Sequence, residues 1–429
     1  MQYGHISQDA HIWISIEDVT MTQDLESNKI PTAEYGQPNR VSVADMLHEI
    51  ASQSVAVNAV MAQMTNQLET LDKQKVKEAK HVFVTGCGDS YFAGIAARLA
   101  FHKDGGVLME PIEALEFGRY VAEYIPSDSI VCTISNSGKA TRSVEAAVQS
   151  RESGAYTVAI TGNEQGWLAQ ESDLILNQSV KLDGLSLTMP SNLETEDARA
   201  SFGLANFLAS LTTLYMLAIH IGEIRGVIGS SERSDLHEEI AGLAKEIDST
   251  VKICMPRVQE YVDQVGSQEN FTFVGGGPGY AMSLFYAAKS YELARVNGTS
   301  QELEEWAHEQ FFITGKNTDL VFVAPVGRSY SRSLELLNTA NVMDARTIVV
   351  TDDQGLEAKD AADIVLPVSG QISEPFMALP YCVPGELLAA LLAQARGRDA
   401  FEFDSELQYV MNMKTIQESE LYSREKAGE

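Results

Sequence analysis

Two short stretches in the first half of the chain combine glycine and hydroxyl-bearing residues in a way that suits an anion. "GCGDS" (residues 86–90) follows the apolar run "HVFV", and "SNSGK" (135–139) follows the apolar run "IVCTI". A strand, a glycine- or serine-rich turn and then a helix leave unpaired backbone amides at the helix N-terminus, where the partial positive charge favours a phosphate or similar anion. The residues that allow close approach or supply hydroxyl groups are Gly88, Ser90, Ser135 and Ser137. Ordinary turn and N-cap residues are the alternative for either stretch alone, and neither completes a nucleotide-binding fingerprint.

A second set of residues, in "AAKSYELARVNGTSQELEEWAHEQ" (287–310), could carry proton transfer. Lys289 and Glu292 are three positions apart in a helical pattern, so they share a helix face, and Glu305 and His308 are spaced in the same way in the next helix. A carboxylate, an imidazole and an amine that converge on one pocket supply a general base, a general acid and a charge stabiliser. The alternative is a solvated helix face.

The elements that position these residues occur twice, in a repeat of about 190 residues. "SIVCTISNSGKATRSVEAA" from Ser129 aligns with "DLVFVAPVGRSYSRSLELL" from Asp319, and "HVFVTGCGDSYFAG" resembles "FTFVGGGPGYAMS". Each copy alternates strands with helices, which predicts two tandem doubly wound α/β domains, each with a parallel sheet covered by helices on both faces. The second copy lacks the polar turn residues, so it should contribute something other than an anion pocket.

The repeat divides the chain into five predicted parts. The apolar segment 201–221 is predicted to be a buried helix of the first domain and not a membrane span. The parts are an N-terminal arm (1–40), a first domain with leading helices (41–225), a helical linker of one or two helices (226–268), a second domain (269–400) and a C-terminal tail (401–429).

The charge balance excludes several classes of partner. The chain has 60 acidic and 31 basic residues, a formal net charge of −29. Nucleic acids and anionic membrane surfaces need a basic footprint, so neither is expected as a partner. The four cysteines are scattered without a CxxC pair, and the N-terminus lacks a basic-then-apolar signal pattern. We therefore expect a cytoplasmic protein, with no metal site and no cofactor.

The order GCGDS, SNSGK, K-x-x-E and E-x-x-H in a duplicated α/β chain resembles the SIS (sugar isomerase) family. It is most similar to the double-SIS isomerase half of glucosamine-6-phosphate synthase and to the fructosamine- and fructoselysine-phosphate deglycases. The resemblance covers roughly residues 45–420 and implies two flavodoxin-like domains and a homodimer.

The resemblance also implies a role for each site residue. Glu292 would be the base that moves a proton between C1 and C2, beside Lys289, and His308 would open the sugar ring from the other subunit of the dimer. Lys414, in "NMKTIQE", matches the family's tail lysine in a looser alignment. The sugar phosphate would bind on loops that include Ser90, Ser135, Asn136 and Ser137.

The sequence departs from the family pattern at three places. Lys139 and Ala140 stand where the family has an acid or amide and a threonine, although Thr141 follows at once. Glu309 and Gln310 replace a Gly-Pro after the histidine. No N-terminal glutaminase domain and no cysteine at position 2 are present, so glutamine-dependent amide transfer by this chain alone is not expected.

These observations predict an aldose–ketose isomerase that acts on an anionic sugar, with a 6-phosphate as the first choice. Three alternatives stay open. The same residues could expel an amine, as a deglycase or deaminase of an amino-sugar or Amadori-product phosphate. Lys139 adds a charge, so a sulfonated sugar is a second alternative. A non-catalytic sugar-phosphate sensor is the third, although such sensors usually carry a basic DNA-binding helix.

Overall fold

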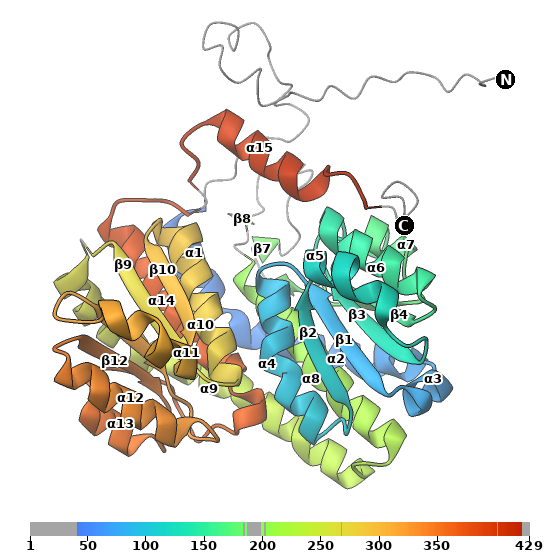
Figure 1. The fold of residues 1–429 in the computed structure, drawn as a ribbon, viewed down its shortest axis with the longest axis horizontal. Coiled ribbons are helices and arrows are strands. Elements are labelled where there is room, and N and C mark those ends of the chain that lie inside the picture. The colour runs from blue at the N-terminus through green and yellow to red at the C-terminus, as the bar shows by residue number, and fades with distance from the viewer. Residues whose placement is uncertain are drawn as a thin grey trace, which may run out of the picture.

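The computed structural model describes residues 41–182, 185–186, 199–200, 203–266, 268–400 and 402–422 of the 429-residue chain. The predicted N-terminal arm, residues 1–40, lies outside the described residues. Two five-stranded parallel sheets stand side by side, each flanked by helices (Figure 1). The prediction of two α/β domains is confirmed.

The first sheet has the strand order β2-β1-β3-β4-β5, with every neighbouring pair parallel. Every residue of the central strands β3 and β4 is buried, as expected when helices cover both faces of a parallel sheet. The strands are β1 (His81–Gly86), β2 (Leu108–Glu113), β3 (Ser129–Ile134), β4 (Tyr156–Thr161) and β5 (Leu174–Asn177). The main helices are α4 (Asp89–Lys103), α6 (Thr141–Glu152), α7 (Trp167–Gln170) and α8 (Leu204–Arg225), with the short α5 (Ala114–Glu116), η4 (Phe117–Val121) and η5 (Ala122–Tyr124) after β2.

The second sheet repeats this order as β10-β9-β11-β12-β13, again all parallel. This is the flavodoxin-like order 2-1-3-4-5 in both copies. Its strands are β9 (Asn270–Gly275), β10 (Asn297–Glu302), β11 (Asp319–Val323), β12 (Arg346–Thr351) and β13 (Ile364–Pro367). Its helices and turns are α10 (Pro278–Lys289), η6 (Ser290–Ala294), α11 (Leu303–His308), η7 (Gln310–Ile313), α12 (Tyr330–Val342), α13 (Leu356–Ala361), η8 (Glu374–Phe376) and α14 (Ala378–Ala395).

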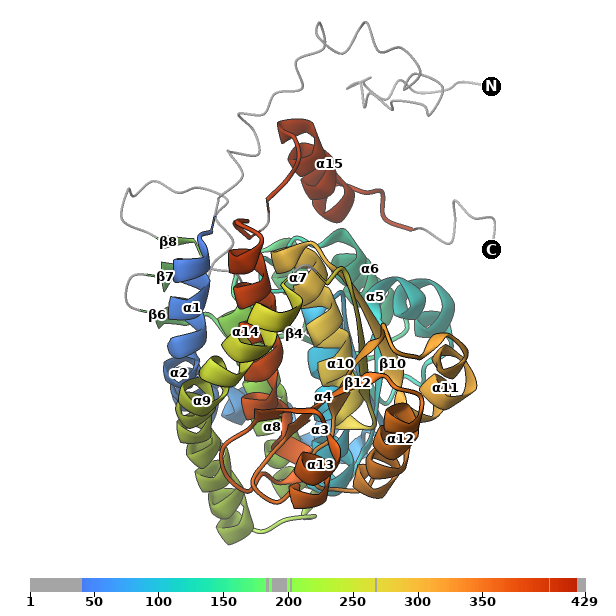
Figure 2. The same cartoon turned by 90° about the vertical axis from the view of Figure 1, so that its left-hand side faces the viewer.

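The remaining elements lead into the sheets, join them or extend from them. α1 (Val43–Ala51), α2 (Gln53–Gln67), η3 (Leu68–Thr70) and α3 (Lys73–Glu78) precede the first sheet. The linker is a single helix, α9 (Ser230–Val265), with Pro256 inside it, and it packs against α2, α8 and α14 (Figure 2). The short strands β6 (Lys181–Leu182), β7 (Leu185–Ser186) and β8 (Arg199–Ala200) form a small third sheet, and α15 (Glu406–Gln417) lies in the tail.

One hydrophobic core runs through both domains. The same cluster of buried residues includes Val84 of β1, Phe273 of β9 and residues of α2, α8, α9, α10 and α14. Helices α4 and α10 pack against each other between the sheets (Figure 1), and Phe207 of α8 stacks on Phe285 of α10 with ring centroids 4.3 Å apart. The two units are therefore fused through their interiors and not merely linked by chain.

Two helices, α8 and α14, are long and apolar enough to cross a membrane by length and composition. In both, about nine-tenths of the apolar window is buried inside the protein: 94% in α8 and 89% in α14. They are the central helices of the shared core, which agrees with the prediction of a buried helix over 201–221.

Candidate active site

The turn after β1 places polar residues at the start of α4. Gly88 has φ 55° and ψ −127°, a conformation that L-residues rarely adopt, so this position favours glycine. A Cβ atom at Gly86 would meet Ser90 Cβ at 2.6 Å, so that glycine is required by the close approach of the helix. The sequence therefore bends sharply here and presents Asp89 and Ser90 at the carboxyl end of the strand.

The turn after β3 lies beside the turn after β1, because β1 and β3 are neighbours in the sheet. The strand order reverses between these two strands, the place where open α/β sheets bind ligands. Ser135 is buried and Ser137 is half-buried, and Ser137 Oγ accepts a hydrogen bond from Lys139 N at 3.3 Å. Gly138, with φ 65°, makes the turn. The two predicted anion-binding loops therefore meet at one edge of the first sheet.

The other residues predicted at this loop have different surroundings. Asn136 turns toward β4 and β5: its carbonyl accepts from Gly162 N at 3.0 Å, and its Oδ1 accepts from Gln178 Nε2 at 3.4 Å. Lys139 is exposed. Thr141 is fully buried, and its Oγ1 has no hydrogen-bond partner among the described residues.

The predicted pair of Lys289 and Glu292 is formed. Lys289 is the last residue of α10, and Glu292 lies in the π-helical turn η6, a type of irregularity that is frequent at functional sites. Lys289 Nζ donates to Glu292 Oε2 at 2.6 Å and to Asp89 Oδ2 at 2.7 Å. Lys289 is 1% exposed, whereas the Glu292 side chain is 36% exposed and can be reached by a ligand. Lys289 of the second domain thus links Glu292 to the first domain's glycine turn.

The charged groups in this cluster shift one another's pKa values. Removal of water by the surroundings raises the pKa of Glu292; Lys289 lowers it, and Asp89 raises it further. Burial opposes the charge on Lys289, but Asp89 and Glu292 outweigh burial and raise the pKa of that ammonium above its usual value. Lys289 therefore stays protonated, and Glu292 is a stronger base than a solvated glutamate.

Glu305 and His308 are not brought to this cluster within one chain. Both are exposed on α11, and His308 Nε2 lies 3.5 Å from Glu304 Oε1. Within the described part of the chain, neither makes a hydrogen bond or ion pair with Lys289 or Glu292. The expectation that all four residues converge is therefore not met inside a single subunit.

Lys414 lies on α15, in a tail that crosses from the second domain to the first. Lys414 is half-buried. Beyond it, Ser419 Oγ accepts from Arg142 Nη2 at 3.1 Å, and Tyr422 N donates to Glu145 Oε2 at 2.6 Å. Glu145 is buried and also pairs with Arg142, so the tail is fastened to α6, the helix that follows the SNSGK loop (Figure 1).

Known proteins share this sequence pattern and this fold. Residues 75–181 match the family model described as the SIS domain. The chain carries a SIS domain. Glutamine–fructose-6-phosphate aminotransferase (isomerizing) of Streptomyces coelicolor is 26% identical over 367 residues, and that of Aquifex aeolicus is 25% identical over 357 residues. The matches cover 82% of this chain in both cases but 56% and 55% of those proteins, so the chain spans about half the length of these relatives.

Solved structures confirm the tandem SIS fold. The C-terminal domain of glucosamine-fructose-6-phosphate aminotransferase from Francisella tularensis superposes with a TM-score of 0.71 at 20% identity, over 83% of this chain and 97% of that one. Glucosamine-6-phosphate deaminase from Thermotoga maritima gives 0.60 at 19% identity, over 82% and 95%. At these identities the likeness establishes the fold, and the predicted resemblance to SIS proteins is confirmed.

Two features of the candidate site and its surroundings were missed by sequence reasoning. Asp89 looked like an ordinary acid in the first turn of a helix, and its contact with Lys289 joins positions 200 residues apart. Glu386 of α14 is fully buried; Gln53 Nε2 lies 2.8 Å from each of its carboxylate oxygens, and burial raises the pKa of Glu386 to about 8. The sequence did not indicate a role for Glu386, because its partner Gln53 is far away in the chain.

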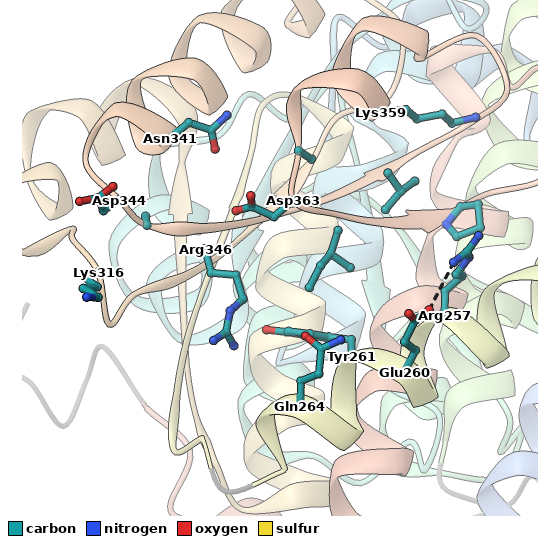
Figure 3. Close-up of a pocket in the computed structure, with 15 residues that line it drawn as sticks. Arg257, Glu260, Tyr261, Gln264, Lys316, Asn341, Asp344, Arg346, Lys359 and Asp363 are labelled. Atoms are coloured by element: carbon teal, nitrogen blue, oxygen red, sulfur yellow. Dashed lines mark hydrogen bonds and ion pairs between the residues drawn. The ribbon is translucent and has the colours of Figure 1, made fainter.

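A large groove of about 960 Å³ lies away from these residues (Figure 3). It sits at the amino ends of β12 and β13 and along α9, whereas the SIS loops follow the carboxyl ends of their strands. Arg257 pairs with Glu260 at 3.2 Å and Arg346 with Asp319 at 3.3 Å, so two of its cations are already neutralised. This groove is not the candidate active site. Among the described residues, no group of three or more His, Cys, Asp or Glu side chains could hold a metal ion.

Proposed function

We propose that this SIS protein is an aldose–ketose isomerase of an anionic sugar, with a sugar 6-phosphate as the substrate class. The observation that carries the proposal is the contact of Lys289 Nζ with both Glu292 and Asp89, because it joins an accessible carboxylate to the polar turn at the first sheet's edge. The relatives named as isomerizing aminotransferases of fructose-6-phosphate support the choice of sugar phosphate.

The proposed reaction moves one proton between neighbouring carbons. The anion binds at the loops of Ser90, Ser135 and Ser137, and His308 opens the sugar ring. Glu292 takes the proton from the carbon next to the carbonyl, and the electron pair moves onto the carbonyl oxygen to give an enediolate. The hydroxyl proton on the neighbouring carbon's oxygen then passes to the former carbonyl oxygen, while the glutamic acid returns its proton to the former carbonyl carbon, so that the neighbouring carbon becomes the new carbonyl. Lys289 or Lys414 stabilises the developing oxyanion, a contribution of about 2–4 kcal/mol per donor.

His308 enters this proposal through a homodimer. Its side chain is 70% exposed in the single chain, and the following turn η7 exposes Phe312 and Ile313, each 81% exposed. Large apolar side chains that face solvent together mark an interaction surface. These residues support a dimer in which His308 reaches the partner's site. We further propose that the protein works in the cytoplasm without nucleic acid or membrane partners.

Incubation of the protein with a panel of aldose and ketose 6-phosphates in D₂O tests the activity. The expected result is interconversion with deuterium entering at C1 or C2, followed by NMR. Glu292→Gln should lower the rate by about 10²–10⁴-fold, because the base is lost. Glu260→Gln, an exposed acid on α9, is the matched control and should leave the rate unchanged. An unchanged rate in Glu292→Gln refutes the mechanism.

A second candidate, deamination or deglycation of an amino-sugar phosphate, is favoured by one observation. Asp89 and Glu292 place two carboxylates around one ammonium group, an excess of negative charge that would suit a protonated amine. Release of ammonia or amino acid from amino-sugar and Amadori-product phosphates separates this reaction from isomerisation. Sulfonated sugars belong in the same panel, and a sensor would show binding by thermal shift without any turnover.

A further inference from the structure

Asp89 is the residue of the first domain that contacts Lys289 of the second domain, and the sequence repeat does not account for it. It is the first residue of α4, and its Oδ2 lies 2.7 Å from Lys289 Nζ. The equivalent turn of the second domain shows that the backbone does not need an acid here. Gly277 has φ 56° and ψ −128°, almost the values of Gly88, and is followed by Pro278. Asp89 therefore serves a purpose other than the formation of the turn.

The contacts of Lys289 limit what that purpose can be. The ammonium donates to one oxygen of Asp89 and one of Glu292, and it lies 5.1 Å from the ring centroid of Phe285. Asp89 Oδ1 is buried and has no hydrogen-bond partner among the described residues. An ion pair that served stability alone would be expected to satisfy both oxygens, because an unpaired buried acceptor costs free energy. The contact of Asp89 with Lys289 is thus better explained by the positioning of the Lys289 ammonium than by a need to join the two domains.

The position of Asp89 has an electrostatic consequence for Glu292. Opposite charges within about 4 Å favour the ionised form of a carboxylate, and like charges disfavour it. Lys289 Nζ binds both carboxylates, which holds the negative charge of Asp89 close to Glu292. That like charge raises the pKa of Glu292, against the lowering effect of Lys289. Loss of the Asp89 charge would therefore lower the pKa of Glu292.

We propose that Asp89 is a positioning residue of the reaction, which holds Lys289 between the domains and sets the basicity of Glu292 through it. This inference rests on the proposed function, because it assigns Asp89 to the same site. It adds a residue from the first domain to the proton-transfer machinery, which otherwise comes from the second.

The pH dependence of kcat/KM for the isomerised sugar tests the inference. In Asp89→Asn the acid limb should move to lower pH by about one unit, because Glu292 ionises more easily. The plateau should fall several-fold, because a less basic carboxylate removes a proton more slowly. Asp89→Glu keeps the negative charge, so its acid limb and its plateau of kcat/KM should lie between those of Asp89→Asn and the wild type. Asp128→Asn, which removes a surface acid paired with Lys80, is the matched control and should keep the wild-type profile. An Asp89→Asn profile that is lowered uniformly without a shift overturns the inference.

A measurement without substrate separates this inference from the proposed function. The effect of Glu292→Gln on the thermal unfolding midpoint is measured at pH 8 in two backgrounds, wild type and Asp89→Asn. In the wild-type background, the change should raise the midpoint or leave it unaltered, because it removes repulsion between carboxylates. In the Asp89→Asn background, it should lower the midpoint, because it removes the one carboxylate partner that Lys289 keeps. Equal effects in both backgrounds overturn the inference, even when no sugar is turned over.

Discussion

The two sheets carry the same turn with different chemistry. Gly88 and Gly277 have nearly identical backbone angles, yet the first is followed by Asp89 and Ser90 and the second by Pro278 and Gly279. The glycine and the strand before it determine the turn, and the residues after it determine what the turn can bind. A duplicated scaffold can therefore keep its geometry in both copies while only one keeps the polar side chains.

The turns after β3 and β11 differ in a second way. In the second domain a carboxylate of the protein itself binds the turn after β11. Arg328 N donates to Glu374 Oε1 at 2.9 Å, and the Arg328 guanidinium also binds Glu374. Glu374 is 10% exposed in its side chain. The turn of the second domain thus has a carboxylate partner within the protein, and in the proposed mechanism this domain contributes Glu292 and His308 and no anion site.

The largest effect on activity is expected from substitution of the two proposed proton-transfer residues of the second domain. Glu292→Gln and His308→Asn should each lose activity by about 10²-fold or more, because each removes a proton-transfer group. If His308 serves the partner's site, unfolding and refolding an equal mixture should restore about a quarter of wild-type activity, since half of the dimers are mixed and each of those has one intact site. Activity is measured by the isomerisation assay. A mixture as inactive as its components would place both residues in the same subunit's site.

The next effect concerns the two β-strand turns. Ser137→Ala should raise KM for a sugar phosphate by about 10–100-fold, because a hydrogen bond to a charged group contributes about 1.5–3 kcal/mol. Ser331→Ala, at the exposed start of α12 in the second domain, should leave KM unaltered. Steady-state kinetics provide both values. Equal effects in the two domains would contradict the assignment of the anion site to the first.

A smaller effect is expected where the domains share their core. Glu386 has its pKa raised from 4.5 to about 8 in the folded state by burial, so its favourable contribution is present below about pH 4.5 and is lost as pH rises toward 8. Glu386→Gln cannot ionise and keeps a hydrogen-bonding group beside Gln53. It should raise the unfolding midpoint by about 2–4 °C at pH 8.5 and by much less at pH 5. Calorimetry measures the unfolding midpoint at both pH values. An equal rise of the midpoint at pH 5 and pH 8.5 would mean that ionisation of Glu386 is not the cause.

The smallest effect should appear at the second domain's turn. Glu374→Ala frees Arg328 and its backbone amide, so sulfate in the millimolar range should raise the melting temperature of this variant more than that of the wild type. Glu357→Ala, on the exposed helix α13, is the control. A sulfate response equal to that of the wild type would show that Glu374 does not occupy an anion position.

Much of the fold was predictable because the signals are local. Repeated apolar runs and glycine turns predicted two parallel sheets covered by helices, and the three-residue spacing predicted the Lys289–Glu292 pair. Asp89, Glu374 and Glu386 were not predictable, because each acts through contacts between distant parts of the chain. The linker could not be assigned as one helix from the sequence, since Pro256 normally interrupts the backbone hydrogen bonds of a helix interior. His308 is exposed on α11 and does not contact Lys289 or Glu292 within the described chain, so its predicted role in the site stays a prediction.

Because the two domains share one core, each domain depends on the other to cover its apolar helices. Either half expressed alone would expose the apolar sides of α8, α10 and α14, which are almost wholly buried in the intact chain. Such halves would be expected to aggregate instead of functioning as simple one-domain proteins.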